Sequence, residues 1–160
     1  MKKSAYGKPL FIQNGDISSL KRVDDYNESQ IQDLVFQHPE SLPISDIDES
    51  YNPVIPVCKE LNTPAGSLDI LMITPNGDIV IIETKLWRNP EARRKVVAQI
   101  LDYAKELANW SYGDLQREIN KKFKLKGNTL YQFSQKASID ISMNESDFVD
   151  AVSRNLRLGK

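Results

Sequence analysis

Two apolar runs joined by a tight turn dominate the middle of the chain. Residues 67–74 and 79–85 are rich in Ile, Leu, Val and Thr, and Pro75-Asn76-Gly77 lies between them. Such runs on either side of a turn predict a β-hairpin. Both runs are apolar over much of their length, so we expect a central hairpin that is covered on both faces.

Three charged residues interrupt this hairpin, namely Asp69, Glu83 and Lys85. Proline favours the second position of a type I turn, asparagine suits the third, and glycine supplies the left-handed residue that follows. The resulting three-residue loop with a bulge would pair Thr74 with Asp78. Asp69 would then lie directly opposite Glu83, on the face shared by Lys85. A two-residue loop would instead turn the two carboxylates to opposite faces.

Two carboxylates that face each other inside a sheet need a counter-charge. Burying a charge is costly unless it is paired or bound to a metal. Either a divalent cation or a nearby lysine would offset the repulsion between Asp69 and Glu83, and an oxygen-rich pair of this kind suits Mg²⁺, with Mn²⁺ as a substitute.

The segment before the hairpin predicts a helix and then a first strand. Ile31, Leu34 and Val35 form an apolar stripe in a helix over residues 28–37, with Asn27 as its N-cap. Residues 54–61 follow as a strand, in which the prolines indicate an edge position or a bulge.

A long amphipathic helix is predicted after the hairpin. Asn89, Pro90 and Glu91 supply a cap, a proline at the first helical position and an acid in the first turn. The helix should run to about Asn109. Its buried face is expected to contain Ala92, Val96, Ile100, Tyr103 and Leu107.

Gln99 lies on the same ridge as Val96 and Tyr103. A buried amide normally has a hydrogen-bond partner, so Gln99 should bond either to the backbone or to another polar group. The first turns of this helix carry Arg93, Arg94 and Lys95, where the helix dipole prefers acids; this arrangement suits phosphate binding.

The C-terminal third is predicted to be mainly helical. Residues 112–124 and 144–156 have helical patterns, the latter with Phe148, Val149, Val152 and Leu156 facing inward. Residues 130–143 are ambiguous, and 131–133 and 139–141 could form short strands. We expect an N-terminal arm over 1–24, a core over 25–110 and a helical C-terminal extension of the same domain over 111–160.

The charge distribution is uneven although the net charge is −1. Residues 1–84 contain 6 Lys/Arg and 13 Asp/Glu, whereas residues 85–126 contain 11 and 5. A basic region of this kind can attract a polyanion, although surface helices are often lysine-rich for other reasons.

Several functional classes are disfavoured by composition. No apolar run approaches the roughly 20 residues of a membrane span, and the N-terminus lacks the apolar segment of a signal peptide. A lone Cys58 excludes an internal disulfide and fits a reducing cytoplasm. Cys58 and the single His38 cannot form a four-ligand zinc site.

The ordered motifs resemble those of the PD-(D/E)xK nuclease superfamily, and within it the RecB-like branch. The resemblance covers roughly residues 25–110. It consists of Glu28 in the first helix, Gly66-Ser67-Leu68-Asp69, Glu83-Thr84-Lys85, and the Q-x-x-x-Y pattern of Gln99 and Tyr103.

This resemblance implies an α/β fold with a restriction-endonuclease-like αβββα(β) core, in which helices flank a mixed sheet. That fold usually has a further strand after the second core helix. Either residues 130–143 supply it or the chain is a piece of a longer protein, in which case an exposed sheet edge would invite homodimerisation.

The resemblance also implies a Mg²⁺-dependent nuclease that hydrolyses DNA, or less often RNA, in DNA repair, restriction or defence. Asp69 and Glu83 would hold the metal with the carbonyl of Thr84, and Glu28 would contribute directly or through water. Lys85 would orient or help deprotonate the attacking water.

The remaining matched residues would support the site or the substrate. Gln99 and Tyr103 would brace the site or contact a phosphate. Four basic residues just beyond the site could contact the nucleic-acid backbone: Arg88, Arg93, Arg94 and Lys95.

Two alternatives remain open from the sequence. One is a non-catalytic nucleic-acid-binding module that retains the nuclease fold. The other is a structural interaction domain in which Glu83 and Lys85 merely pair with neighbours. The nuclease is favoured because a purely binding domain has no need to oppose two carboxylates.

Overall fold

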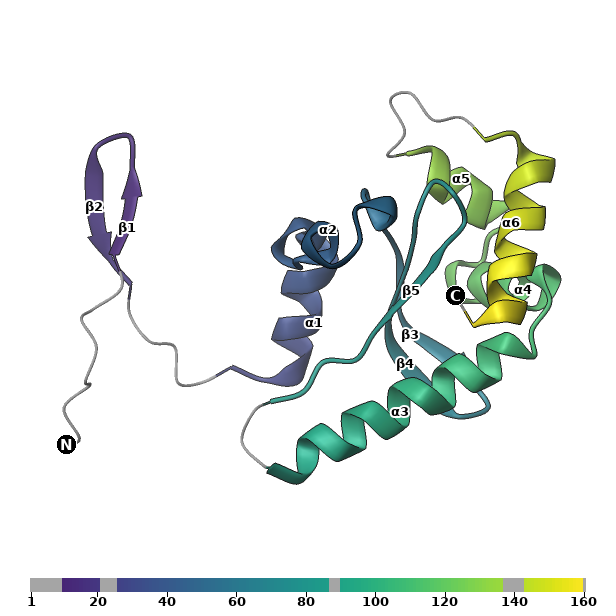
Figure 1. Ribbon diagram of the computed structural model, residues 1–160, viewed down its shortest axis with the longest axis horizontal. Helices are drawn as coiled ribbons and strands as arrows, with labels where there is room; N and C mark the ends of the chain where they lie inside the picture. Colours follow the sequence, from purple (N-terminus) through teal and green to yellow (C-terminus); the bar gives the residue numbers. More distant parts are fainter. Residues whose placement is uncertain (1–9, 21–25, 87–89, 137–142, 160) are drawn as a thin grey trace.

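A three-stranded antiparallel sheet separates two layers of helices (Figure 1). The computed structural model describes residues 10–20, 26–86, 90–136 and 143–159. The strands lie in the order β3 (Ile55–Thr63), β4 (Gly66–Ile73) and β5 (Ile79–Ile82). On one side lie α1 (Glu28–Gln37) and α2 (Ile44–Ile47); on the other lie α3 (Pro90–Ala108), α4 (Tyr112–Phe123), α5 (Thr129–Gln135) and α6 (Glu145–Leu158). The predicted α/β class is therefore confirmed.

Alternate side chains of β4 enter two separate apolar clusters. Ile70 and Met72 pack with Val35 of α1. Leu71 and Ile73 join a larger cluster with α3, α4, α5 and α6, which includes Tyr103. Because β4 is the middle strand, it is covered on both faces as the hydrophobic pattern predicts. β5 is only half-buried, because it is an outer strand.

The elements around the hairpin agree with the sequence analysis. α1 spans the predicted residues, and the Asn27 side chain accepts the backbone N–H of Gln30. β3 is an outer strand with a register shift between Pro56 and Cys58, which is the irregularity that its prolines indicate. Among the described residues, no helix combines the length and apolarity needed to cross a bilayer.

Two expectations about the end of the sheet differ from the structure. Residues 131–133, predicted as a possible strand, lie within α5, because Asn128 caps that helix and Leu130 and Ser134 are buried along it. The alternative strand at 139–141 lies outside the described residues. All three strands of the main sheet are antiparallel, so the described part of the chain does not contain the parallel strand that a mixed sheet requires.

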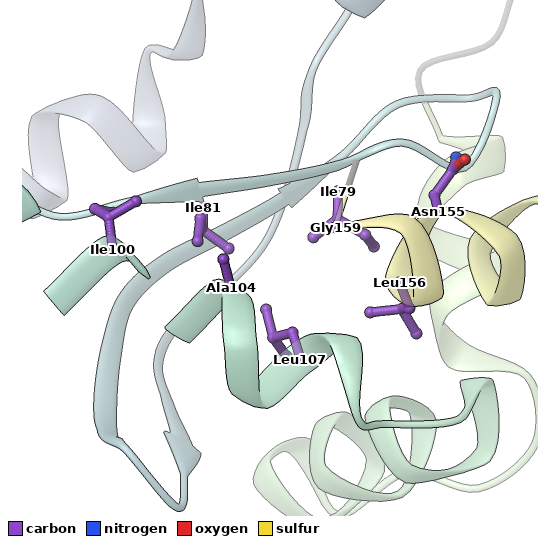
Figure 2. Close-up of a pocket in the computed structure, with 8 residues that line it drawn as sticks. All are labelled: Ile79, Ile81, Ile100, Ala104, Leu107, Asn155, Leu156 and Gly159. Atoms are coloured by element: carbon purple, nitrogen blue, oxygen red, sulfur yellow. The ribbon is translucent and has the colours of Figure 1, made fainter. Parts of the chain in front are cut away.

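An apolar groove lies beside β5 (Figure 2). Its volume is about 240 Å³. The aliphatic side chains come from β5, α3 and α6, and include Ile79, Ile81, Ile100, Leu107 and Leu156. The outer strand thus carries unpaired backbone groups next to apolar side chains, within the described residues. Homodimerisation through this edge stays a prediction.

The N-terminal segment contains a separate two-stranded hairpin. β1 (Leu10–Gln13) and β2 (Asp16–Ser19) pair across a turn in which Asn14 and Gly15 have φ values of 52° and 89°. These values match a turn that needs two left-handed residues. Figure 1 shows this hairpin away from the main sheet, inside the region predicted as an arm.

Helix α6 fixes the turn between β4 and β5. The buried Asn155 side chain donates to the carbonyl oxygen of Gly77 at 2.9 Å and to Oδ1 of Asp78 at 3.1 Å. Gly77 has φ +80°, and a Cβ there would lie 3.0 Å from the Val152 side chain. The turn therefore needs glycine both for its backbone conformation and for the close approach of α6.

We predict that Asn155→Ala destabilises the protein by about 1–3 kcal/mol, because it leaves the Gly77 carbonyl buried without its donor. Urea unfolding followed by circular dichroism measures the change. Ser146→Ala, at an exposed position of the same helix, is the control and should have little effect. Equal stability of the two variants would contradict the role of Asn155.

Candidate active site

The hairpin has the register that its turn sequence predicts. The Thr74 N–H donates to the Asp78 carbonyl oxygen at 3.0 Å, and the ladder continues to the pair Ile70 and Ile82. The next step along the two strands places Asp69 opposite Glu83. Asp69 is two residues before Leu71, and Glu83 is two residues after Ile81. Because side chains two residues apart share a face of a strand, both carboxylates are on the face of the sheet that packs with Tyr103 and Leu107 of α3.

Glu83 has a buried carboxylate whose negative charge is only partly offset by its neighbours. Its side chain is 2% exposed, and its Oε2 atom has no hydrogen-bond partner among the described residues. Its Oε1 atom is 3.8 Å from Nζ of Lys85. Burial raises the pKa of Glu83 from 4.5 to about 7, and the charge of Asp69 acts in the same direction more strongly than Lys85 opposes it.

Asp69 is held by the residue that follows Glu83. Its Oδ2 atom accepts the backbone N–H of Thr84 at 2.7 Å and the Thr84 hydroxyl at 2.8 Å. Both bonds end on the same oxygen, and no hydrogen bond from the described residues reaches Oδ1. Thr84 itself is buried, so it fixes the Asp69 carboxylate beside Glu83.

Helix α1 contributes Glu28 to the same end of the hairpin. One Glu28 oxygen accepts Nζ of Lys85 at 3.3 Å, and the other accepts the backbone N–H of Leu86 at 3.2 Å. Burial lowers the pKa of Lys85, but the hydrogen bond to Glu28 and the surrounding carboxylates outweigh it, so this pKa lies above its ordinary value. Lys85 is therefore an ammonium cation at neutral pH and acts here as a positive charge.

Helix α3 braces the edge of the site through Tyr103. This side chain is 4% exposed, and its hydroxyl donates to the carbonyl oxygen of Ser67 at 2.7 Å. Gln99 forms a side-chain hydrogen bond with Tyr103, which supplies the partner that its position requires. Burial and the Glu83 charge raise the pKa of Tyr103. Tyr103 was expected either to brace the site or to contact a phosphate, and its burial favours bracing.

Glu60 is a site residue that the sequence analysis missed. The pairs Lys59–Ile70 and Leu61–Leu68 place it beside Asp69 across β3 and β4. Its carboxylate accepts Nε2 of Gln32 at 3.0 Å and the Ser67 hydroxyl at 2.5 Å.

The backbone of Glu60 is also unusual, with φ +52°. Such a conformation is rare for residues other than glycine and requires support from the surrounding structure. The Glu60 carbonyl accepts Nζ of Lys122 at 2.9 Å. The only sequence signal was an acidic residue in a strand. The predicted strand ended at residue 61, whereas β3 continues to Thr63 and pairs with Gly66, which sets the register of Glu60.

The predicted basic residues are only partly described. Arg94 and Lys95 are exposed near the start of α3. Arg93 belongs to the same helix, but its side chain lies outside the description, and Arg88 lies outside the described residues. Arg94 and Lys95 thus remain accessible to a phosphate backbone.

Asp69 and Glu83 carry the carboxylate oxygens at which a divalent cation could bind. Hard cations prefer such oxygens, and among the described residues the buried Oε2 atom of Glu83 has no hydrogen-bond partner. Glu28 and the carbonyl of Thr84 would complete the set. The described residues contain no group of three or more His, Cys, Asp or Glu side chains placed to hold an ion, so the metal site stays a prediction.

Comparison of the chain with protein-family models, curated proteins and solved structures found no match.

We predict that Glu83→Gln removes a pH-dependent loss of stability. The folded protein holds a proton on Glu83 up to about pH 7, whereas an unfolded chain releases it near pH 4.5. Stability from this group is fully present below pH 4.5 and is lost as pH rises toward 7. In the absence of metal, the difference in unfolding free energy between the variant and the wild type should shift in favour of the variant by up to roughly 3 kcal/mol between pH 4 and pH 8.

Urea unfolding in EDTA across this pH range measures the effect. Glu49→Gln, which changes an exposed carboxylate, is the control and should produce no comparable divergence. Parallel stability curves for wild type and Glu83→Gln would show that Glu83 is not an uncompensated buried carboxylate.

Proposed function

We propose that this chain is a divalent-metal-dependent nuclease that hydrolyses phosphodiester bonds of DNA. The observation that carries the proposal is the buried, unpartnered Oε2 atom of Glu83 opposite Asp69. An arrangement that weakens the fold in this way is typical of a functional site, because a bound cation would remove the cost. The resemblance to PD-(D/E)xK nucleases supplies the reaction class.

A divalent cation at Asp69 and Glu83 would lower the pKa of a bound water and neutralise charge on the phosphate. The Lys85 ammonium group would stabilise the negative charge that develops on the phosphate oxygens. Glu28 orients Lys85 through their 3.3 Å contact. Because the pKa of Lys85 is raised, this residue acts as a charge stabiliser rather than as the base that removes the water proton.

The surrounding residues would position the substrate and hold the strands. Tyr103 fixes β4 two residues from Asp69 through the Ser67 carbonyl. Arg94 and Lys95 are exposed on α3 and would contact phosphates of the substrate backbone without reading its sequence.

A second candidate is a non-catalytic nucleic-acid-binding module. It is favoured by the position of Asp69, whose Oδ2 atom is already occupied by two hydrogen bonds from Thr84. In this case Lys85 alone would offset the charge of Glu83, and the basic start of α3 would bind phosphate without cleavage.

Cleavage of plasmid and of single-stranded circular DNA with Mg²⁺ or Mn²⁺ separates the two candidates. We expect Asp69→Asn to lower the cleavage rate by about 10²-fold or more, because one ligand of the cation is neutralised. Asp33→Asn is the matched control, since Asp33 pairs with Lys59 outside the site. Cleavage that survives Asp69→Asn, or no cleavage with either metal and any substrate, would contradict the nuclease proposal.

Metal binding can be tested without cleavage. We predict that Mg²⁺ raises the thermal unfolding temperature more at pH 8 than at pH 6, because at lower pH the ion must displace the Glu83 proton. Glu83→Gln should abolish most of this shift, whereas Glu49→Gln should retain it. A shift that is equal in both variants would place the ion elsewhere.

A further inference from the structure

A second groove, lined by charged and aromatic residues, lies where α3 ends, between the α3–α4 connection and α6. Its volume is about 680 Å³, within the range of ligand-binding clefts. Trp110 and Ser111 line it from the connection, and Asp150, Arg154 and Arg157 line it from α6. None of these residues belongs to the carboxylate site.

The two arginines of this groove have no ion-pair partner among the described residues. They are three residues apart on α6 and therefore neighbours on one helix face, where like charges repel. Asp150 lies one turn before Arg154 but forms no ion pair with it. Arg117 of α4 differs, because it bonds to Asp114 at 2.7 Å. Arg157 is in the last turn of α6, where the helix dipole stabilises a positive charge. Arg154 lies before this turn, so the dipole does not account for it.

Trp110 supplies an aromatic side chain to the same groove and is half-buried. Paired guanidinium groups bind phosphate oxygens in a fixed geometry. Bases of an unpaired strand stack on aromatic side chains, whereas those of a duplex are covered by their neighbours. A groove that combines both elements has the chemistry of a single-strand binding site.

We propose that this groove binds single-stranded nucleic acid, with phosphates on Arg154 and Arg157 and a base stacked on Trp110. The groove begins at Ala108, five residues along α3 from Tyr103, which corresponds to about 7–8 Å of helix. The choice of nucleic acid as the ligand rests on the proposed nuclease function. Binding here needs neither metal nor cleavage.

Fluorescence anisotropy of a labelled oligothymidine, measured in EDTA at several salt concentrations, tests the phosphate contacts. Arg154→Ala combined with Arg157→Ala should weaken binding and reduce the slope of log affinity against log salt by about 1.4, as expected for two lost contacts. Arg117→Ala combined with Lys121→Ala removes the same charge from α4, where both side chains are ion-paired. Equal weakening by the two double variants, or none by the first, would overturn the proposal.

Tryptophan fluorescence tests the stacking contact. In a Trp87→Phe background, oligothymidine should quench Trp110, and the double arginine variant should need a higher concentration for the same quenching. Trp110→Ala should weaken binding about tenfold, within the range for one stacked base. No quenching, or equal quenching by a blunt duplex, would contradict single-strand binding. Because metal is absent, failure of the nuclease proposal would leave these results unchanged.

Discussion

The burial of Glu83 opposite Asp69 is the constraint on which the rest of the site depends. Two adjacent carboxylates in a sheet repel each other, and the 2% exposure of Glu83 removes most of the water that would screen them. The protein compensates only in part. Lys85 is near one oxygen of Glu83, Thr84 holds Asp69, and the second oxygen of Glu83 has no partner. The pKa of Glu83 is therefore raised to about 7.

This arrangement requires a fixed register, and the structure secures it at the other end of the hairpin. A slip of one residue would turn every side chain of β5 to the opposite face. Asn155 of α6 bonds to Gly77 and Asp78 at the turn. The close packing of Val152 against Gly77 adds a steric limit. Helix α6 thus helps to hold the register that brings Glu83 opposite Asp69, although it lies far from the carboxylates in sequence.

The polar residues around the carboxylates also join the layers of the fold. Glu28 ties α1 to Lys85, and the Tyr103 hydroxyl ties α3 to the Ser67 carbonyl. The Glu60 carboxylate bridges Gln32 of α1 and the Ser67 hydroxyl of β4. Both helix layers therefore meet the same short stretch of β4. Such networks hold a site rigidly when each member is satisfied, and the exception here is Glu83, the group that we propose binds a cation.

The sequence by itself determined the elements and the register of the hairpin. Helix caps such as Asn27, the apolar periodicities and the Pro75-Asn76-Gly77 turn are local signals, and local backbone preferences carry them directly into structure. Only the tertiary structure decided that residues 131–133 are helical, since the burial of Leu130 and Ser134 along one side of α5 outweighed a short strand-like pattern. It also showed that β3 continues to Thr63, which pairs with Gly66, and the register that starts at this tight turn places Glu60 beside Asp69. The burial that raises the pKa of Glu83 is also a tertiary effect, because it depends on helices distant in sequence that cover the sheet.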